Sequence, residues 1–254
     1  MRAEPSPAVI LRTRPLGEAD LVVVLLTPDQ GKIDAAAARA RSSHKRFAGG
    51  LSPGMRGVAS VARGRGALLR LEGFESTADH APVGADLTRF AYVAYLCELT
   101  DELVLARHPD PELFAALCEA LLQVIAGTPR AVHLRQYELA LLRCLGFLPV
   151  LDGCCVCGQP VAEDRGTLAF DGPRGGLLCS SHDRGVARLP AEAIAAIRHL
   201  ADGGDPAPVD AAPPAVRKAL RDALQAIVRS HLRRALHSQA FFAALPREAS
   251  GEGV

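Results

Sequence analysis

The chain of 254 residues contains no tryptophan, and aromatic residues make up only 4% of it. Scarce aromatics leave few side chains on which the bases of a single-stranded nucleic acid can stack. Long apolar segments are missing too, because the longest aliphatic run, residues 21–26, is far shorter than the roughly 20 residues that a membrane-spanning helix needs. No apolar stretch of signal-peptide length follows the N-terminus. We therefore expect a cytoplasmic protein that does not enter membranes.

Motifs of common enzyme classes are also missing. The sequence has no G-x-x-x-x-G-K-[ST] phosphate-binding loop, no H-E-x-x-H motif and no G-x-S-x-G motif. Residues 42–45 match S-x-x-K, but the companion motifs of that enzyme class are absent and the segment lies in a basic loop. The carboxylates are scattered and do not pair in the way that a metal-dependent nuclease requires. We therefore expect that the protein is not an enzyme.

Cysteine occurs seven times, which is an odd number, and Cys97, Cys118 and Cys144 lie within apolar helical patterns. Buried free thiols of this kind are typical of a reducing cytosol rather than of a disulfide framework.

Three of the other cysteines and a histidine form a metal-ligand pattern. Two residues separate Cys154 from Cys157, and the same spacing separates Cys179 from His182. Three thiolates and one imidazole fill the tetrahedral coordination of Zn²⁺ and leave no position for water, so the pattern predicts one structural zinc site. Cys155 can replace Cys154 as a ligand, although only one residue would then separate the first pair. The alternative is a knuckle that packs without metal.

The net charge is only +1, but the basic residues are unevenly distributed. Residues 31–70 contain nine basic residues and a single acid, Asp34, whereas residues 81–153 contain nine acids and five arginines. A cationic surface attracts a phosphate backbone and releases its counterions. The basic segment is therefore a candidate for DNA binding, and its alternative is a solvated face of the protein.

A second basic row follows one face of the last predicted helix, where an amphipathic bundle helix with a solvated back is the alternative. The combined DNA-binding candidates are Lys32, Arg39, Arg41, Lys45, Arg46, Arg63, Arg65, Arg217 and Arg221.

Five short segments of the first eighty residues alternate with turn signals and predict strands. They are residues 8–14, 21–27, 32–38, 57–63 and 67–73. Antiparallel strands of this length suit a small OB-type barrel, although an SH3-like barrel has the same pattern.

The apolar period becomes helical after residue 79. Asp86 and Asp110 are predicted helix N-caps, and a third helix covers residues 129–145. Pro190 begins a fourth helix, and the last one covers residues 215–237. We expect an α+β fold with an OB-fold DNA-binding domain over residues 1–80 and a helical domain over residues 81–250. A zinc-knuckle element over residues 151–188 is inserted in the helical domain.

Several segments resemble the RecO family of bacterial DNA repair and recombination mediators. They are residues 9–20 (VILRTRPLGEAD), 26–27, 31–32, 40–42, 95–99 (YLCEL), 141–149 (LLRCLGFLP), 151–154 (LDGC) and 157–158. The order and the spacing of the segments both agree. A strand-rich start, an L-x-x-L-G-x-x-P segment and an adjacent cysteine knuckle are together far more specific than any one of them.

The resemblance implies an OB-fold domain, a helical domain with a zinc element, and binding of single- and double-stranded DNA with annealing of complementary strands. It implies the RecFOR pathway, in which the partner RecR and the protein together load RecA on DNA coated by single-stranded-DNA-binding protein (SSB). The acidic C-terminal tail of SSB would be a second partner. Arg135 and Arg143 are candidates for binding this tail, because an acidic, apolar-ended peptide favours a cation beside an apolar groove. At the fourth ligand position this sequence has His182, whereas zinc-bearing members of the family have a cysteine.

Two other classes of protein remain as alternatives. A zinc-knuckle scaffold or transcription regulator would use the acidic helical region to bind another protein. A metal-dependent hydrolase would need an open coordination position, which the four-ligand pattern does not leave.

Overall fold

The computed structural model describes residues 4–43, 46–47, 49–64, 68–243 and 245. The chain divides into two compact units. Of the described residues, the first unit contains those within 4–129 and within Leu236–Leu245, and the second contains Arg130–Ala235. The expected OB-fold domain (residues 1–80), helical domain (residues 81–250) and zinc-knuckle element (residues 151–188) were predicted as separately folding parts. The division into two units does not test separate folding, so these boundaries stay predictions.

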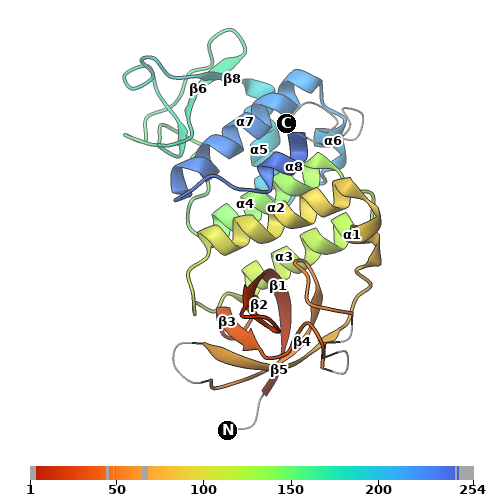
Figure 1. Cartoon of the computed structure of the whole chain (residues 1–254). Helices are drawn as coiled ribbons and strands as arrows, with labels where there is room; N and C mark the ends of the chain where they lie inside the picture. The colour runs from red at the N-terminus through yellow and green to blue at the C-terminus, as the bar shows by residue number, and fades with distance from the viewer. Residues whose placement is uncertain (1–3, 44–45, 48, 65–67, 244, 246–254) are drawn as a thin grey trace. The chain divides into compact units, whose positions relative to one another are not determined.

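Five strands of the first unit form a closed barrel (Figure 1). They are β1 (Glu4–Leu16), β2 (Asp20–Thr27), β3 (Gly31–Ala37), β4 (Arg56–Ala62) and β5 (Leu69–Ser76). Their order is β1-β2-β3-β5-β4, in which β3 and β5 are parallel and the other neighbours are antiparallel. A closed barrel of five short strands is OB-like. The expected fold class, an OB-type barrel followed by helices, is confirmed.

Along each strand, successive side chains point alternately to the inside and the outside of the barrel. Val23 and Leu25 of β2 lie in the barrel core together with Phe47, which comes from the β3–β4 loop. Val22, Val24 and Leu26 alternate with them and are also buried. Helix α2 packs against β1 and helix α3 packs against β2. Residues 21–26 of β2 are therefore all apolar, because both faces of the strand are covered.

The first unit contains four helices among its described residues. They are α1 (Ala81–Ala85), α2 (Leu87–Leu103), α3 (Pro111–Ile125) and α8 (Gln239–Ala243). Asp86 accepts hydrogen bonds from the amides of Thr88 and Arg89, and Asp110 accepts one from the amide of Leu113. Both predicted N-caps are therefore confirmed.

Helix α8 joins the first unit although it lies near the C-terminus of the chain. The Glu98 carboxylate accepts hydrogen bonds from the amides of His237 and Ser238 at 2.9 and 2.7 Å. Phe242 lies against Tyr95 with 5.5 Å between the ring centroids. The last long helix, α7 (Pro214–His231), therefore ends earlier than expected, and the chain turns back to α2.

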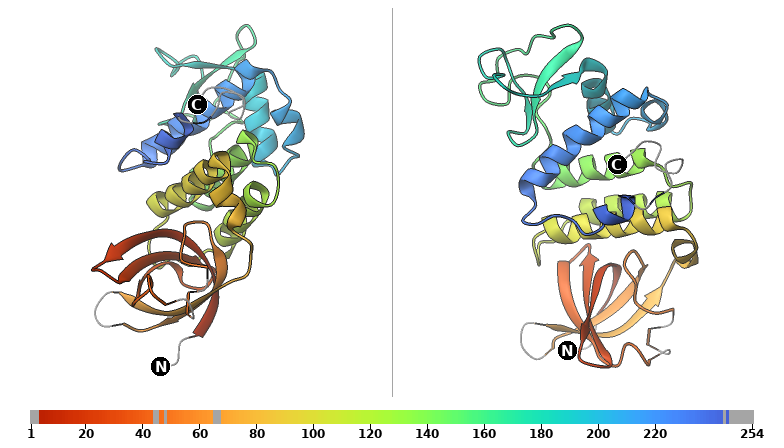
Figure 2. Two further views of the ribbon diagram at one scale, coloured as in Figure 1. Left: turned by 45° about the vertical axis from the view of Figure 1, so that its right-hand side comes forward. Right: turned by 45° about the horizontal axis from the view of Figure 1, so that its top comes forward.

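The second unit combines helices with a small sheet (Figure 2). Besides α7, its helices are α4 (Ala131–Cys144), α5 (Ala191–Ala201) and α6 (Ala207–Asp210). Its strands are β6 (Thr167–Asp171), β7 (Gly176–Leu177) and β8 (Arg188–Pro190), in the order β7-β6-β8. Helix α4 packs against α5, α6 and α7. Among the helices of the described residues, none is long and apolar enough to span a bilayer.

Candidate metal centre and basic surfaces

Two tight turns of the second unit carry the predicted metal ligands. In the first turn the amide of Gly158 donates to the carbonyl of Cys154 at 2.8 Å, and Gly158 has a φ of 72°, which glycine adopts at little cost. In the second turn the amide of His182 donates to the carbonyl of Cys179, also at 2.8 Å. Each pair of ligands is thus held by the backbone of its own turn.

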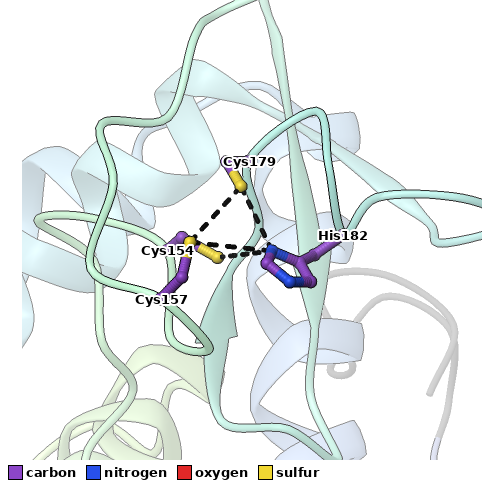
Figure 3. A group of neighbouring side chains, drawn as sticks. All are labelled: Cys154, Cys157, Cys179 and His182. Carbon is purple, nitrogen blue, oxygen red and sulfur yellow. Dashed lines mark hydrogen bonds between the residues drawn. The ribbon is translucent and has the colours of Figure 1, made fainter.

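The two turns bring the ligand atoms of Cys154, Cys157, Cys179 and His182 within 4.8 Å of one another (Figure 3). The sulfurs of Cys157 and Cys179 are 3.7 Å apart, and the three sulfurs lie 3.3 to 3.7 Å from Nδ1 of His182. Bond lengths of about 2.3 Å to sulfur and about 2.0 Å to nitrogen place neighbouring ligands of a tetrahedral ion about 3.5 to 3.8 Å apart. The four side chains therefore fit around one metal ion.

The surroundings favour the thiolate form, which is the form that binds metal, at Cys154 and Cys179 but not at Cys157. Burial raises the pKa of Cys154, but neighbouring backbone amides and the Cys157 thiol outweigh it and lower the pKa to about 6. The hydrogen bond with His182 lowers the pKa of Cys179 and raises the pKa of His182. The pKa of Cys157 is raised, because burial and the neighbouring thiols outweigh a backbone hydrogen bond.

Cys155, the other thiol of the first turn, lies outside the ligand cluster. It packs against the apolar core below the knuckle, which contains Ala169 and Leu178. Burial raises the pKa of Cys155, so this thiol favours its neutral form. The geometry therefore favours Cys154 over Cys155 as the first ligand.

Three of the predicted DNA-binding residues, Arg39, Arg41 and Arg46, lie exposed on the β3–β4 loop. Contacts with the β1–β2 turn hold this loop. The amide of Arg39 donates to Asp20 Oδ1 at 2.8 Å, and Nη1 of Arg41 donates to the carbonyl of Glu18 at 3.2 Å. The guanidinium of Arg46 lies 5.1 Å from the centroid of the Phe47 ring.

Strand register places Arg63 at the same end of the barrel. Ala37, at the end of β3, pairs with Leu21 at the start of β2, while Ala35 pairs with Leu69 at the start of β5. Arg63 follows the end of β4 and is exposed. We call Arg39, Arg41, Arg46 and Arg63 the barrel-end arginines. Lys45 and Arg65 fall outside the described residues.

Lys32 lies at the start of β3, away from the barrel-end arginines. Its side chain is 14% exposed and forms an ion pair with Asp101 of α2 at 3.3 Å. In the second unit, Arg217 donates to the carbonyls of Asp210 and Ala212 at 2.8 and 2.9 Å.

Arg221 of α7 is also engaged, because it forms an ion pair with Asp222 at 3.1 Å.

The two candidates for binding an acidic peptide tail differ in exposure. Arg135 is buried and pairs with Glu138 at 2.8 Å, whereas Arg143 is exposed in the last turn of α4. Arg14, which was not among the candidates, is also exposed on β1 close to the β1–β2 turn. Arg14 was not a candidate because it lies in the first predicted strand, outside the basic segment of residues 31–70.

Two family models match most of the chain. The model described as Recombination protein O N terminal matches residues 1–78, and the one described as Recombination protein O C terminal matches residues 84–240. Relatives called DNA repair protein RecO extend over nearly the same length. The protein of Anaeromyxobacter sp. (strain K) is 41% identical over 239 residues, covering 92% of this chain and 93% of the relative. The protein of Myxococcus xanthus is 34% identical, covering 93% and 95%.

Proposed function

The chain belongs to the recombination protein O (RecO) family of DNA repair proteins, and on this basis we propose that it is a recombination mediator. It binds single- and double-stranded DNA, anneals complementary strands and catalyses no covalent reaction. The observation that carries this proposal is the exposure of the barrel-end arginines on one end of an OB-like barrel. OB-folds bind oligonucleotides through the face of strands 2 and 3 and the flanking loops.

Annealing without ATP requires a cationic surface that holds two phosphate backbones close together while their bases stay free to pair. The barrel-end arginines supply charge, and Phe47, the aromatic ring that Arg46 contacts, is buried and does not offer its face to a base. Each phosphate contact releases counterions, so DNA affinity falls as the salt concentration rises.

Zinc is the proposed structural ion of the cluster formed by Cys154, Cys157, Cys179 and His182. All four coordination positions are taken by side chains, so zinc supplies cross-linking of the two turns and no catalytic water. In the same unit, Arg188 donates to the hydroxyl and the carbonyl of Thr167 at 3.0 and 3.1 Å and connects β8 to β6. The metal ligands and the Arg188–Thr167 hydrogen bonds together stabilise residues 151–188, a segment that has little regular secondary structure.

The partners follow from family membership as part of the same proposal. Acting at the nucleoid in the cytoplasm, the protein works with RecR to load RecA on DNA coated by SSB. Arg143 is the better placed cation for the acidic tail of SSB, because Arg135 already pairs with Glu138.

The test is annealing of complementary labelled oligonucleotides without ATP, with and without SSB, across a salt series. We expect acceleration by the protein that weakens steeply with salt. The double variant Arg39→Glu with Arg41→Glu should reduce annealing and lower the slope of log affinity against log salt by about 2. The control is Arg165→Glu with Arg174→Glu, which changes the net charge equally at exposed sites of the second unit.

Two results would count against the proposal. Equal loss in both double variants would mean that only net charge matters. Absence of annealing and of salt-dependent DNA binding in the unaltered protein would remove the proposed function and favour a zinc-knuckle scaffold that binds proteins.

A further inference from the structure

Phe147 and His231 form a stacked ring pair on the second unit. Their ring centroids are 3.8 Å apart and their planes differ by 12°. Phe147 is 39% exposed and His231 is half-buried, so the pair lies at the surface. A large aromatic ring is exposed here although aromatic residues are rare in the whole sequence.

The end of α4 fixes the position of Phe147. Gly146 has a φ of 76°, its amide donates to the carbonyl of Arg143 at 3.0 Å, and the amide of Phe147 donates to the carbonyl of Leu142 at 2.7 Å. This pair of hydrogen bonds around a left-handed glycine is the Schellman motif, which ends a helix and sets the direction of the next residue. Phe147 therefore has a defined orientation.

The end of α7 supplies the second ring. His231 is the last residue of α7, and α4 and α7 pack against each other within the same unit. The stack thus forms where two packed helices both end. Its geometry depends on the helix packing of this unit alone.

The segments that carry the two rings are basic in sequence. Arg143, Arg229 and Arg233 are exposed, and the sequence has no acid in residues 143–149 or in residues 223–238. Cations near helix C-termini are favoured by the helix dipole, so their presence alone does not indicate a ligand. An exposed aromatic pair among such cations, with no acid nearby in either segment, is the combination found where bases stack beside a phosphate backbone.

We propose that Phe147 and His231 form a stacking platform for a base of single-stranded DNA, with the exposed arginines of the ends of α4 and α7 (Arg143, Arg229 and Arg233) available to neutralise the phosphates on either side. The inference rests on the proposed function and adds a second contact site, on a different unit from the barrel-end arginines. Single strands present free base faces, whereas the bases of a duplex are stacked on one another. The platform therefore selects single-stranded DNA, and the barrel-end arginines do not discriminate.

The absence of tryptophan provides a direct probe. Phe147→Trp introduces the only indole of the chain, so its fluorescence reports on this position alone. We expect an oligothymidylate to quench this fluorescence and an equal length of duplex to leave it nearly unchanged. The Phe147→Trp variant should also retain the affinity of the unaltered protein for single strands.

Phe147→Ala should weaken binding of the oligothymidylate by about tenfold at a salt concentration that suppresses phosphate contacts, with duplex affinity unchanged. Val150→Ala is the matched control, because Val150 is an exposed apolar residue three positions away and is 47% exposed. It should bind like the unaltered protein. Metal content and thermal unfolding verify that each variant is folded.

Three results would overturn the platform. They are an unquenched indole with bound single strand, equal affinities of the Phe147→Ala and Val150→Ala variants, and quenching by an acidic, apolar-ended peptide but not by the oligonucleotide. In all three the barrel-end arginines can still support salt-dependent annealing. Failure of the platform is therefore distinguishable from failure of the proposed function.

Discussion

Lys32 of β3 forms an ion pair with Asp101 of α2, with 3.3 Å between Nζ and Oδ1. Arg12 of β1 reaches the other oxygen of the same carboxylate at 2.8 Å, and the Asp101 side chain is only 7% exposed. Lys32 also donates to the backbone carbonyl of Asp101. One carboxylate near the end of α2 therefore ties two strands of the barrel to the helix that covers it.

Replacing Lys32 should affect stability rather than DNA binding. We expect Lys32→Met to lower the free energy of unfolding by about 2 kcal/mol, because a buried charge loses one of its partners. Arg41→Met should lower the salt slope of DNA affinity by about 1 with little change in stability. Urea unfolding and a salt titration of both variants check this. A stable Lys32→Met variant with a reduced slope would instead make Lys32 a DNA contact.

Metal content should distinguish the two neighbouring thiols of the knuckle. We expect the unaltered protein and Cys155→Ser to hold one zinc ion per chain, and Cys154→Ser to lose most of it, because only Cys154 lies among the ligand atoms. Structural zinc contributes on the order of 10 kcal/mol to local folding, so Cys154→Ser should be cleaved by protease within residues 151–188. Elemental analysis and limited proteolysis measure both effects. Zinc loss in Cys155→Ser alone would reverse the assignment.

Glu98 should hold the C-terminal segment against α2. Glu98→Ala removes the acceptor of the His237 and Ser238 amides, and we expect a loss of about 1 kcal/mol, comparable to the loss of a helix N-cap. Hydrogen exchange of these two amides should become faster. Glu119→Ala is the control, since Glu119 is exposed and contacts only the Gln123 side chain among the described hydrogen bonds. Unchanged exchange in Glu98→Ala would show that the aromatic contacts suffice.

Mild acid should destabilise the protein. Burial lowers the pKa of His80 and of His133 below the ordinary value of 6.5, and the neighbouring charges offset this only in part. As the pH falls below 6.5, the unfolded chain takes up protons that the folded chain does not, so the free energy of unfolding decreases. Urea unfolding between about pH 7.5 and pH 5.5 measures the decrease. His80→Gln should flatten this dependence, and an unchanged slope would assign it to other groups.

Local chemistry explains which parts of the fold the sequence predicts well. Strand alternation and the aspartate caps at Asp86 and Asp110 depend on neighbouring residues, and the structure has them as expected. The sheet of β6, β7 and β8 was not predicted, because its strands of two to five residues are too short to show a period. The apolar pattern also continues past His231, although the chain leaves the helix there to reach α2.

The same reasoning explains the candidate sites. Cys154 and Cys157 lie in one tight turn, so their spacing in the sequence is enough to predict that both are metal ligands. Charge counting cannot show that Lys32 points to Asp101, because that depends on which helix covers the barrel. Phe147 and His231 lie far apart in the sequence and meet only through the packing of α4 and α7.

The return of Leu236–Leu245 to the first unit has a consequence for biosynthesis. A ribosome releases the N-terminal segment early, and domains generally fold as units during synthesis. Here the barrel and α1 to α3 leave the ribosome long before their last helix, which emerges only after Arg130–Ala235 of the second unit have been translated. Until then the α2 surface that receives Phe242 stays uncovered on the nascent chain. Premature termination after residue 235 would therefore damage the unit at the opposite end of the sequence.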